Sequence, residues 1–503
     1  MTSMLARARA LDALGENEAA MRAYVDVLCA IPTHFGALAG LGAVAIRTGQ
    51  PIDLARARQH YEAALRLEPS NRAVHRGLAI LLLWLGEREA AKRHGREGLL
   101  GRADLWPCRG EGRPVSVLLV LSAVGSNVPI DHLVDDRVFQ TWTLTPEFFD
   151  PNAELPPHDV VLNIVGNADS HRPALDVVAT ILSRTSARVL NPPERVRDTG
   201  RAVNALRLGR IPGVVTPRTE EWDRESLSAS DAPDALARAG FTWPLLVRSP
   251  GFHMGQHFVK LDGPEDLSGA LATLPGASLF VIQFLDMRGA DGKVRKYRAM
   301  IVDGCLYPLH LAVSTNWKVH YFSADMAGNA QHRAEDEAFL QDMPGVLGPL
   351  AMQALERVRE ALGLDYGGID FALDGRGNVV VFEANATMVV PLPDEGAQWL
   401  YRAIPVGRVH DAVHRMIVRA AGSAPHSKAE STEASVGLTA LAPSFSASVL
   451  ASEAEASLGR ASGLESVGTA FASLESGSLL VSPDCESFVE PSAAPSCAVV
   501  ASA

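Results

Sequence analysis

The sequence is poor in cysteine, contains no long apolar run and carries no excess of positive charge. Its five cysteines lie far apart, without CxxC or CxxH spacing, which excludes a disulfide framework and a zinc site and fits a reducing compartment. The tightest apolar stretch, Leu78–Gly86, is much shorter than the ~20 residues of a membrane helix. The N-terminal residues are basic but lack the apolar core of a signal peptide. We therefore expect a cytoplasmic protein with no membrane segment.

A formal net charge of −12 argues against a general nucleic-acid binder, because such proteins neutralise phosphates with a basic surface. We therefore expect no nucleic-acid partner. The chain of 503 residues, 47% of them hydrophobic, is too long for one ordinary domain and can fill two or three cores.

The N-terminal residues contain a recurring pattern of a glycine turn, a small alanine and a helix. Ala20, Ala57 and Ala90 recur in register, and Tyr24 and Tyr61 follow in the first two units. A period in the mid-thirties with these residues resembles tetratricopeptide repeats, each of which is a pair of helices. The resemblance implies an all-α repeat domain over residues 1–103, although a generic helical bundle would share the pattern. Because repeat domains present concave surfaces, we expect a peptide or protein partner here.

Residues 104–114 are expected to be a linker, and residues 114–195 alternate between strand and helix signals. Strand, turn, helix and strand in succession indicate an α/β domain with a parallel sheet. Asn127, Asn167 and Asp169 follow the predicted strands, at the edge where open parallel sheets bind ligands.

Residues 196–420 are predicted to form an α+β domain. We expect a helix that ends near Pro212, mainly strands from residue 241 onward, a helix over 352–364 and a last helix near His410–Arg419. Beyond Ala420 the composition changes to Ser, Ala and Glu with isolated apolar residues. Residues 421–503 are therefore predicted to be a low-complexity, mostly disordered tail.

One buried strand of this domain ends in a cation and a glycine-containing loop. Arg248 ends the strand, and Gly251, His253 and Gly255 lie in the loop. A chain of phosphates needs a nearby cation and backbone N–H groups that can approach without a Cβ clash. An ordinary hairpin with a surface arginine would show the same pattern.

Two further strands carry polar residues. The residues that end the first of them are Gln283, Phe284, Leu285 and Asp286. On the second, alternation places Lys296 and Arg298 on one face, with Arg295 and Tyr297 on the other. Two cations on a strand that at once becomes apolar indicate an anionic ligand, and a cross-strand salt-bridge ladder is the alternative.

The last hairpin carries carboxylates at the end of an apolar strand. Glu383 and Asn385 are two positions apart and project to one face, and antiparallel pairing through the turn "DGRGN" brings Asp370 close. A buried carboxylate is costly unless a positive group meets it. Two carboxylates and an amide oxygen form the hard, all-oxygen set that Mg²⁺ prefers. A hairpin with a structural acid is the alternative.

The segments just described follow one another along the chain from about Pro114 to Arg419. In their order and residue types they resemble an ATP-grasp ligase of the glutathione-synthetase and RimK-like branch. The resemblance implies that Arg248, where the family usually has Lys, binds the triphosphate together with its loop. It implies that backbone groups of Phe284 and Leu285 and the amide of Gln283 bind adenine, and that Asp286 meets the ribose.

The same resemblance assigns a catalytic role to Arg298, which would stabilise the charge that develops during transfer. Lys296 would be a further nucleotide-binding cation. On the preceding helix Arg201, or alternatively Arg197, would contact phosphate. The residues implied to hold two Mg²⁺ ions, or Mn²⁺ in their place, are Asp370, Glu383 and Asn385.

The implied reaction is an ADP-forming ligation. A substrate carboxylate attacks the γ-phosphate of ATP to give an acylphosphate, and an amine, or less often a hydroxyl, then attacks the acyl carbon. The repeat-like segment favours a peptide or protein substrate, or a role in peptide natural-product biosynthesis. The alternatives are a non-catalytic repeat scaffold with a vestigial nucleotide fold and an ATP-grasp small-molecule kinase.

The segment Pro308–Gly328 departs from the better-known branches of this family. It carries His310, Asn316, Trp317, Lys318 and His320, which could line an acceptor or carboxylate pocket, with Trp317 as a packed loop anchor in the alternative. The tail repeats Leu-Glu-Ser, which supplies both a carboxylate and a hydroxyl. We therefore hypothesise that the tail is a fused substrate, the alternative being a solvated tail without function.

Overall fold

The computed structural model describes residues 2–13, 17–30, 37, 40, 44, 51–99, 102–123, 127–128, 133–150, 152–252, 255, 257–319, 324–391 and 396–422. The predicted tail therefore lies outside the described residues from residue 423 onward. Within the described ranges, no helix combines the length and the apolar character needed to cross a membrane.

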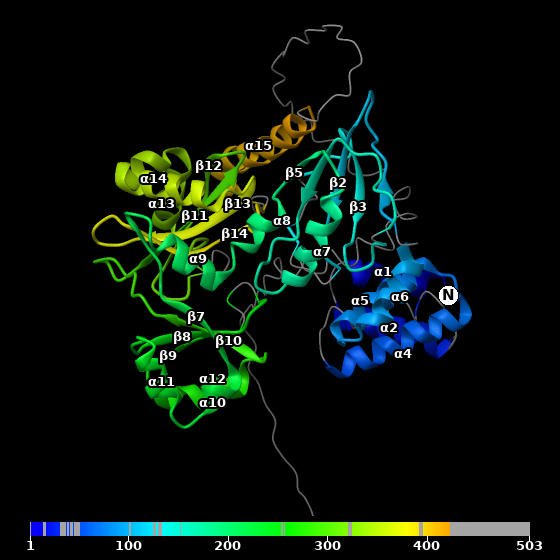
Figure 1. Cartoon of the computed structure of the whole chain (residues 1–503), viewed down its shortest axis with the longest axis horizontal. Helices are drawn as coiled ribbons and strands as arrows, with labels where there is room; N and C mark the ends of the chain where they lie inside the picture. The colour runs from blue at the N-terminus through cyan, green and yellow to red at the C-terminus, as the bar shows by residue number, and fades with distance from the viewer. Residues whose placement is uncertain are drawn as a thin grey trace, which may run out of the picture.

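The N-terminal part consists of helices packed in pairs (Figure 1). Tyr24 covers Gly40, where an added Cβ would lie 2.3 Å from the ring, and Tyr61 covers Gly77 in the same way at 2.5 Å. Both tyrosine–glycine contacts therefore use one packing device, in which the absence of a glycine side chain leaves room for a tyrosine ring. The helices are α1 (Thr2–Ala13), α2 (Asn17–Ala30), α4 (Pro51–Leu67), α5 (Arg72–Trp84) and α6 (Arg88–Leu99).

A five-stranded sheet follows, in the order β1-β3-β2-β4-β5, with β1 antiparallel to β3 and the other neighbours parallel. Alternate residues of its central strand face opposite cores: Leu118 packs with α7 (Arg172–Leu182), and Leu119 with α15 (Ala403–Gly422). Phe148 also contacts Gly95 of α6, which joins this sheet to the helices. The strands are β1 (Asp104–Trp106), β2 (Val115–Val120), β3 (Phe139–Leu144), β4 (Val160–Asn163) and β5 (Arg188–Leu190).

A separate lobe is built on a four-stranded antiparallel sheet in the order β7-β10-β8-β9 (Figure 1). Its own core is closed by short helices and includes Phe241, Leu245 and Leu279. The elements are β7 (Thr219–Asp223), α10 (Arg224–Ser228), α11 (Ala232–Arg238), β8 (Leu245–Arg248), β9 (Phe258–Leu261), η1 (Pro264–Asp266), α12 (Leu267–Thr273) and β10 (Ser278–Gln283).

The second five-stranded sheet has the order β12-β11-β13-β14-β6. Helix α14 covers one face, and α15 lies against the other and also packs on the first sheet. The elements are β6 (Val214–Val215), β11 (Val294–Val302), β12 (Cys305–Ser314), α13 (Ala330–Gln341), α14 (Met343–Leu362), β13 (Tyr366–Leu373), β14 (Val379–Asn385) and η3 (Ala397–Arg402).

Buried hydrogen bonds join the two five-stranded sheets. Asn191, just after β5, accepts from the backbone N–H groups of Asp365 and Tyr366 at 3.0 Å and donates to the Tyr366 carbonyl at 2.7 Å. The Asp365 carboxylate in turn accepts from the Asn191 backbone at 2.8 Å. Because these bonds satisfy polar groups on both sides, they fix the end of β5 against the start of β13.

The structure corrects several sequence-based expectations. The segment 104–114 is not wholly a linker, because Asp104–Trp106 pairs with β3 as an edge strand. The single helix expected to end near Pro212 is two helices, α8 (Pro193–Arg197) and α9 (Arg201–Leu208), separated by a break that ends at Gly200. The strand-rich region also contains α12 and α13, which the sequence analysis did not predict. The last two helices begin earlier than predicted, at Met343 and Ala403.

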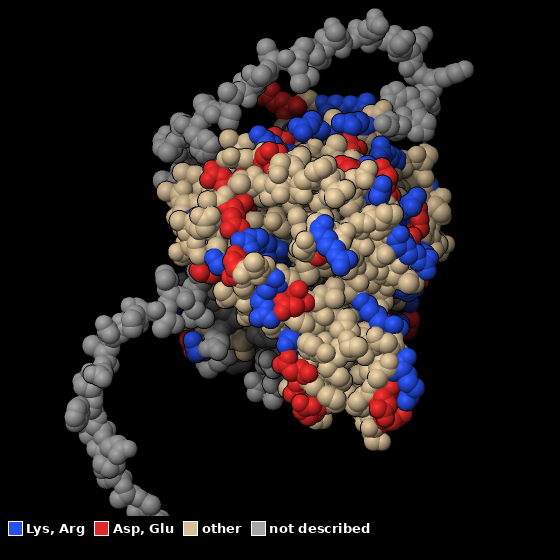
Figure 2. All heavy atoms as spheres, turned by 90° about the vertical axis from the view of Figure 1, so that its left-hand side faces the viewer, with Lys and Arg blue, Asp and Glu red and all other residues tan. Residues whose placement is uncertain are grey.

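Charged side chains of both signs are mixed over the face drawn in Figure 2. Lysine and arginine alternate with aspartate and glutamate among uncharged residues there, so this face has no extended field of one sign.

Candidate functional site

The end of β14 forms the floor of the site. Val379, Val380 and Val381 are buried, whereas Glu383 and Asn385 are half-buried and separated by the buried Ala384. The alternation of the strand thus turns both polar side chains to one face. The amide of Asn385 donates to Glu383 Oε1 at 2.9 Å, which aligns the two.

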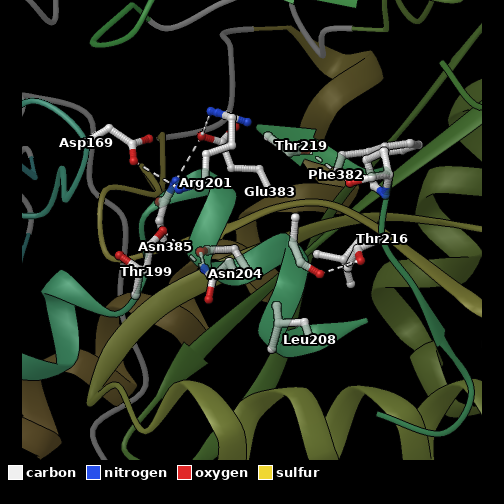
Figure 3. A pocket seen from close by; sticks show the side chains of 14 residues that line it. Asp169, Thr199, Arg201, Asn204, Leu208, Thr216, Thr219, Phe382, Glu383 and Asn385 are labelled. Carbon is white, nitrogen blue, oxygen red and sulfur yellow. Dashed lines mark hydrogen bonds and ion pairs between the residues drawn. The ribbon is translucent and has the colours of Figure 1, made fainter. Parts of the chain in front are cut away.

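Helix α9 brings a cation to this floor. It begins at Arg201, whose backbone N–H donates to Asp169 Oδ1 at 3.0 Å and whose guanidinium meets Glu383 Oε1 at 2.7 Å. Figure 3 shows Arg201 between the two carboxylates. Asp169 comes from the loop after β4, and its charge suits a helix N-terminus. Burial raises the pKa of Asp169 above its ordinary value, Arg201 opposes this shift and Glu383 adds to it.

Two adjoining cavities open at this place. They contain about 390 Å³ and 340 Å³ of space not occupied by protein atoms, part of which is open to solvent. One runs between α9 and β14 toward Leu208 (Figure 3), and the other reaches Arg248 and Gly251 beyond β8. The residues that line both are Asp169, Thr199, Arg201, Glu383 and Asn385. The shared lining makes the two cavities one candidate binding site.

Arg248 is a buried cation at the end of β8. Its side chain is only 7% exposed, lies over the Phe258 ring at 5.5 Å and donates to the Phe252 carbonyl. Burial, with the nearby positive charge of Arg201, lowers the pKa of Arg248 to about 10. It therefore stays protonated at neutral pH and lacks water on most sides, which favours binding of an anion.

The loop after Arg248 has the backbone freedom that was predicted for it. Gly251 and Gly255 have φ angles of +80° and +71°, a region in which residues with a Cβ are strained. Gly251 lines the second cavity, whereas Gly255 lies under Lys318, whose side chain an added Cβ would meet at 2.6 Å. His253 is outside the described residues.

A second group of charges lies on the same sheet face. Lys296 and Arg298 project together from β11, as the alternation of the strand predicts. Both meet Asp370 on β13, so in this structure they form the cross-strand salt bridges that were the alternative to an anionic ligand. The distances to Asp370 are 2.6 Å from Lys296 Nζ and 2.6 Å from Arg298 Nε. Burial alone would raise the pKa of Asp370, but Arg298 and Lys296 outweigh it and hold that pKa well below its usual range. Asp370 also pairs in register with Glu383, so the two charge groups are neighbours.

The predicted adenine segment follows β10. The Gln283 amide is engaged with Thr242, accepting from its backbone N–H at 3.0 Å and donating to its carbonyl at 2.8 Å. Phe284 packs edge-on against Trp317 with ring centroids 6.0 Å apart, and Asp286 forms an ion pair with Arg288. Leu285, next to them, is half-buried.

The structure therefore divides the predicted site residues. Those that share the cavities are Arg201, Arg248, Gly251, Glu383 and Asn385. Those described outside the cavity lining are Gly255, Gln283, Phe284, Leu285, Asp286, Lys296, Arg298 and Asp370. Arg197, the alternative to Arg201, pairs instead with Asp176 at 3.1 Å.

The side chains between 310 and 320 do not form one cluster. His310 is buried on β12 opposite Arg298, and burial, followed by Arg298, lowers its pKa well below the ordinary value. Trp317 instead packs on Phe258 at 5.6 Å, and Lys318 donates to the Phe258 carbonyl at 3.2 Å. These contacts favour Trp317 as a loop anchor. His320 lies outside the described residues.

Sequence analysis placed Asp169 at a ligand-binding edge of the first sheet but did not assign it to the nucleotide site, and it did not single out Thr199 or Asn204. Asn204 lies inside α9 and donates to the Ala384 carbonyl at 2.5 Å and to the Thr199 carbonyl at 3.2 Å, which locks that helix to β14. The available sequence signal for Asn204 was an asparagine within a helix, because asparagine is a poor helix former and its presence there indicates another role. For Asp169 the signal was its position after a parallel strand.

The donor set fits a divalent ion at one place. Glu383 supplies a carboxylate and Asn385 an amide oxygen on one face, beside a cavity. The amide oxygen also accepts from the backbone N–H and the hydroxyl of Thr387, at 2.9 Å and 2.8 Å. This chemistry suits Mg²⁺ or Mn²⁺ with a phosphate completing the shell. Asp370, in contrast, is 1% exposed and already enclosed by two cations. Over the described ranges, no group of three or more His, Cys, Asp or Glu residues is arranged around a common metal position.

Comparisons with known proteins give likenesses of structure only. No protein-family model matches the chain, and no curated protein matches its sequence. Among solved structures, the VanG D-Ala:D-Ser ligase of Enterococcus faecalis is 10% identical, with a TM-score of 0.40 over 61% of this chain and 100% of that chain. A RimK domain protein ATP-grasp of Sphaerobacter thermophilus is 16% identical, with 0.38 over 60% and 98%.

A further solved structure, the D-alanine-D-alanine ligase of Coxiella burnetii, is 11% identical, with a TM-score of 0.37 over 61% of this chain and 96% of that chain. Identities and scores this low decide nothing about the activity of this chain. The function proposed below is carried by the geometry of the site.

Proposed function

We propose that the chain is an ATP-dependent, ADP-forming ligase that joins a carboxylate to an amine, or less often a hydroxyl, through an acylphosphate. The observation that carries the proposal is the convergence of Arg201, Arg248, Glu383 and Asn385 on one cavity system from α9, β8 and β14. Two arginines beside a carboxylate and an amide suit a triphosphate that arrives with a divalent ion. The order of these residues along the chain resembles that of ATP-grasp ligases, with Arg248 where the family usually has Lys.

Each residue has a definite part in this proposal. Arg248 binds phosphate oxygens, with the backbone of the loop at Gly251 close by. Arg201 leaves Glu383 and takes a phosphate oxygen, and Arg298 faces the transferred group. Glu383 and Asn385 would hold a divalent ion, and such an ion would supply positive charge to the phosphates.

Adenine recognition falls mainly to the backbone of Phe284 and Leu285. The Gln283 amide is already engaged with Thr242, so its contribution is to fix the segment. Asp286 can exchange Arg288 for a ribose hydroxyl at small cost, because exposed ion pairs contribute little to stability.

The substrate is proposed to be a peptide or protein, or a precursor in peptide natural-product biosynthesis. The support is the N-terminal helical region, in which Tyr24 over Gly40 and Tyr61 over Gly77 repeat one packing device. This device suits tetratricopeptide-like units, whose concave faces bind extended peptides.

ADP release measured with pooled carboxylates and amines, followed by mass spectrometry of the product, tests the proposal. Glu383→Gln should reduce turnover by at least ~10²-fold, the scale of losing one charge-stabilising group, while the protein stays folded. Glu335→Gln is the matched control, because Glu335 pairs with Arg295 on the opposite face of β11 at 2.7 Å. It should leave turnover unchanged.

Three other outcomes would contradict the proposal. A phosphorylated product without a ligated one would identify a small-molecule kinase. No turnover in either the natural protein or Glu383→Gln, with partner binding retained, would identify a scaffold. Equal loss of turnover in Glu383→Gln and Glu335→Gln would show that the site residues act only through stability.

A further inference from the structure

Asp370 is bound by the protein's own cations on both of its oxygens. Oδ1 accepts from Arg298 Nε at 2.6 Å, while Oδ2 accepts from Arg298 Nη2 at 2.9 Å and from Lys296 Nζ at 2.6 Å. The carboxylate is 1% exposed. Three donors therefore occupy most of the lone-pair positions that a carboxylate offers.

Glu383 is in a different situation, although it stands beside Asp370 in the register of the sheet. Its Oε1 meets Arg201 and the amide of Asn385, and it lines both cavities. An incoming anion can draw Arg201 away, because Arg201 lines the same cavities. Lys296 and Arg298 do not line these cavities, so a ligand bound there does not draw them away from Asp370 as it draws Arg201 away from Glu383.

A divalent ion on Asp370 would have to displace buried donors and accept two positive charges within a few ångström. Mg²⁺ requires a near-octahedral shell and keeps several waters. A carboxylate enclosed by an ammonium and a guanidinium offers neither the open positions nor the negative field that such a shell requires.

We infer that the Lys296 ammonium and the Arg298 guanidinium occupy, as resident cations, the place of a second metal ion, so that the nucleotide site takes a single divalent ion at Glu383 and Asn385. Asp370 is then a positioning residue, which holds Arg298 toward the transferred phosphate. This inference rests on the proposed function, since it concerns the nucleotide complex of that site.

The test counts metal ions per bound nucleotide. The full chain is dialysed to equilibrium against Mn²⁺ and a non-hydrolysable imido analogue of ATP, and protein-bound Mn²⁺ is compared with protein-bound nucleotide. The inference predicts one Mn²⁺ per nucleotide in the natural protein. Asp370→Asn should leave that ratio at one and change the Mn²⁺ affinity less than about threefold. Loss of a residue that only hydrogen-bonds to a metal ligand typically lowers metal affinity by about 10–100-fold, and loss of a ligand itself lowers it further.

Asp291→Asn is the matched control. Asp291 pairs with Arg295 at 2.8 Å, outside the site, so its loss removes one carboxylate without touching the metal position. A ratio of two in the natural protein that falls to one in Asp370→Asn would overturn the inference and leave the proposed function standing.

The design remains decisive if Asp370→Asn fails to fold, because the ratio in the natural protein alone separates one ion from two. If the natural protein binds no nucleotide, the proposed function fails, and the inference fails with it.

Discussion

Replacing Asp370 by Asn should destabilise the second five-stranded sheet. The substitution keeps the shape of the side chain but leaves Lys296 and Arg298, whose side chains are 16% and 18% exposed, without their counter-charge. Removing one partner of a buried ion pair costs about 3–5 kcal/mol. Because both cations keep some contact with water, we expect the lower end of that range, about 3 kcal/mol at pH 7.

The loss should depend on pH with a definite sign. Arg298 and Lys296 hold the pKa of Asp370 below its unfolded value, which is about 3.9 for aspartate. The contribution of Asp370 is therefore fully present above that unfolded pKa and is lost as the pH falls through the folded pKa. Since Asn does not titrate, the gap between the two proteins should be constant from pH 7 to about 5 and should narrow below about pH 4.

Hydrogen exchange of peptides from Tyr366–Leu373 measures this stability locally, which matters because a chain with several domains does not unfold in one step. The assay compares the natural protein, Asp370→Asn, Lys296→Met and the double variant in a thermodynamic cycle. Lys296→Met should destabilise the natural background and cost little or nothing in the Asp370→Asn background. A gap under about 1 kcal/mol at pH 7, or one that persists unchanged in acid, would refute the buried-pair reasoning.

Three further results are expected. Arg201→Met should weaken binding of the ATP analogue in calorimetry about tenfold, the value of one charge-assisted hydrogen bond, and unchanged affinity would remove Arg201 from the phosphate site. Gly77→Ala should unfold the N-terminal helices at lower urea concentration, because the new Cβ meets the Tyr61 ring, and Tyr61→Leu should restore part of the loss. Gly269→Ala, in α12 and with open space around its Cβ, should leave the unfolding of the N-terminal helices unchanged. If the tail is a substrate, incubation with ATP and Mg²⁺ should lower the intact mass by one water per bond within 421–503, and an unchanged mass would contradict that hypothesis.

Much of the sheet that carries the site follows from local sequence signals. The turn between β13 and β14 contains Asp374, Gly375 and Gly377 and fixes an antiparallel pair, so the neighbourhood of Asp370 and Glu383 was predictable and is observed. The period of two in β11 likewise predicts that Lys296 and Arg298 share a face. Both inferences depend only on residues close together in sequence.

The pairing of charges across the site was not predictable in the same way. Asp169 and Arg201 come from different segments, and their contact depends on how α9 and the first sheet dock against β14. Which group pairs with Asp370 depends on the direction in which its side chain points. That direction is affected by β-bulges, which directly follow both Arg298 and Asp370. A bulge re-aims the side chains beside it, and the sequence gives no local signal that selects a cation over a metal as the partner.

The charged residues on this face of the second five-stranded sheet form two groups, and the group at Glu383 and Arg201 affects how a metal ion and a nucleotide would bind. Arg201 neutralises Glu383 in this structure, so a metal ion alone must compete with a guanidinium for the same carboxylate. In the proposed complex, a triphosphate alone would meet Arg201 and Arg248 but also the charges of Asp169 and Glu383, which line the same cavities. With a divalent ion present as well, Arg201 would turn to the phosphate and Glu383 would be left for the ion, so each ligand would remove the obstacle to the other. Linkage then requires that nucleotide and divalent ion raise each other's affinity by the same factor.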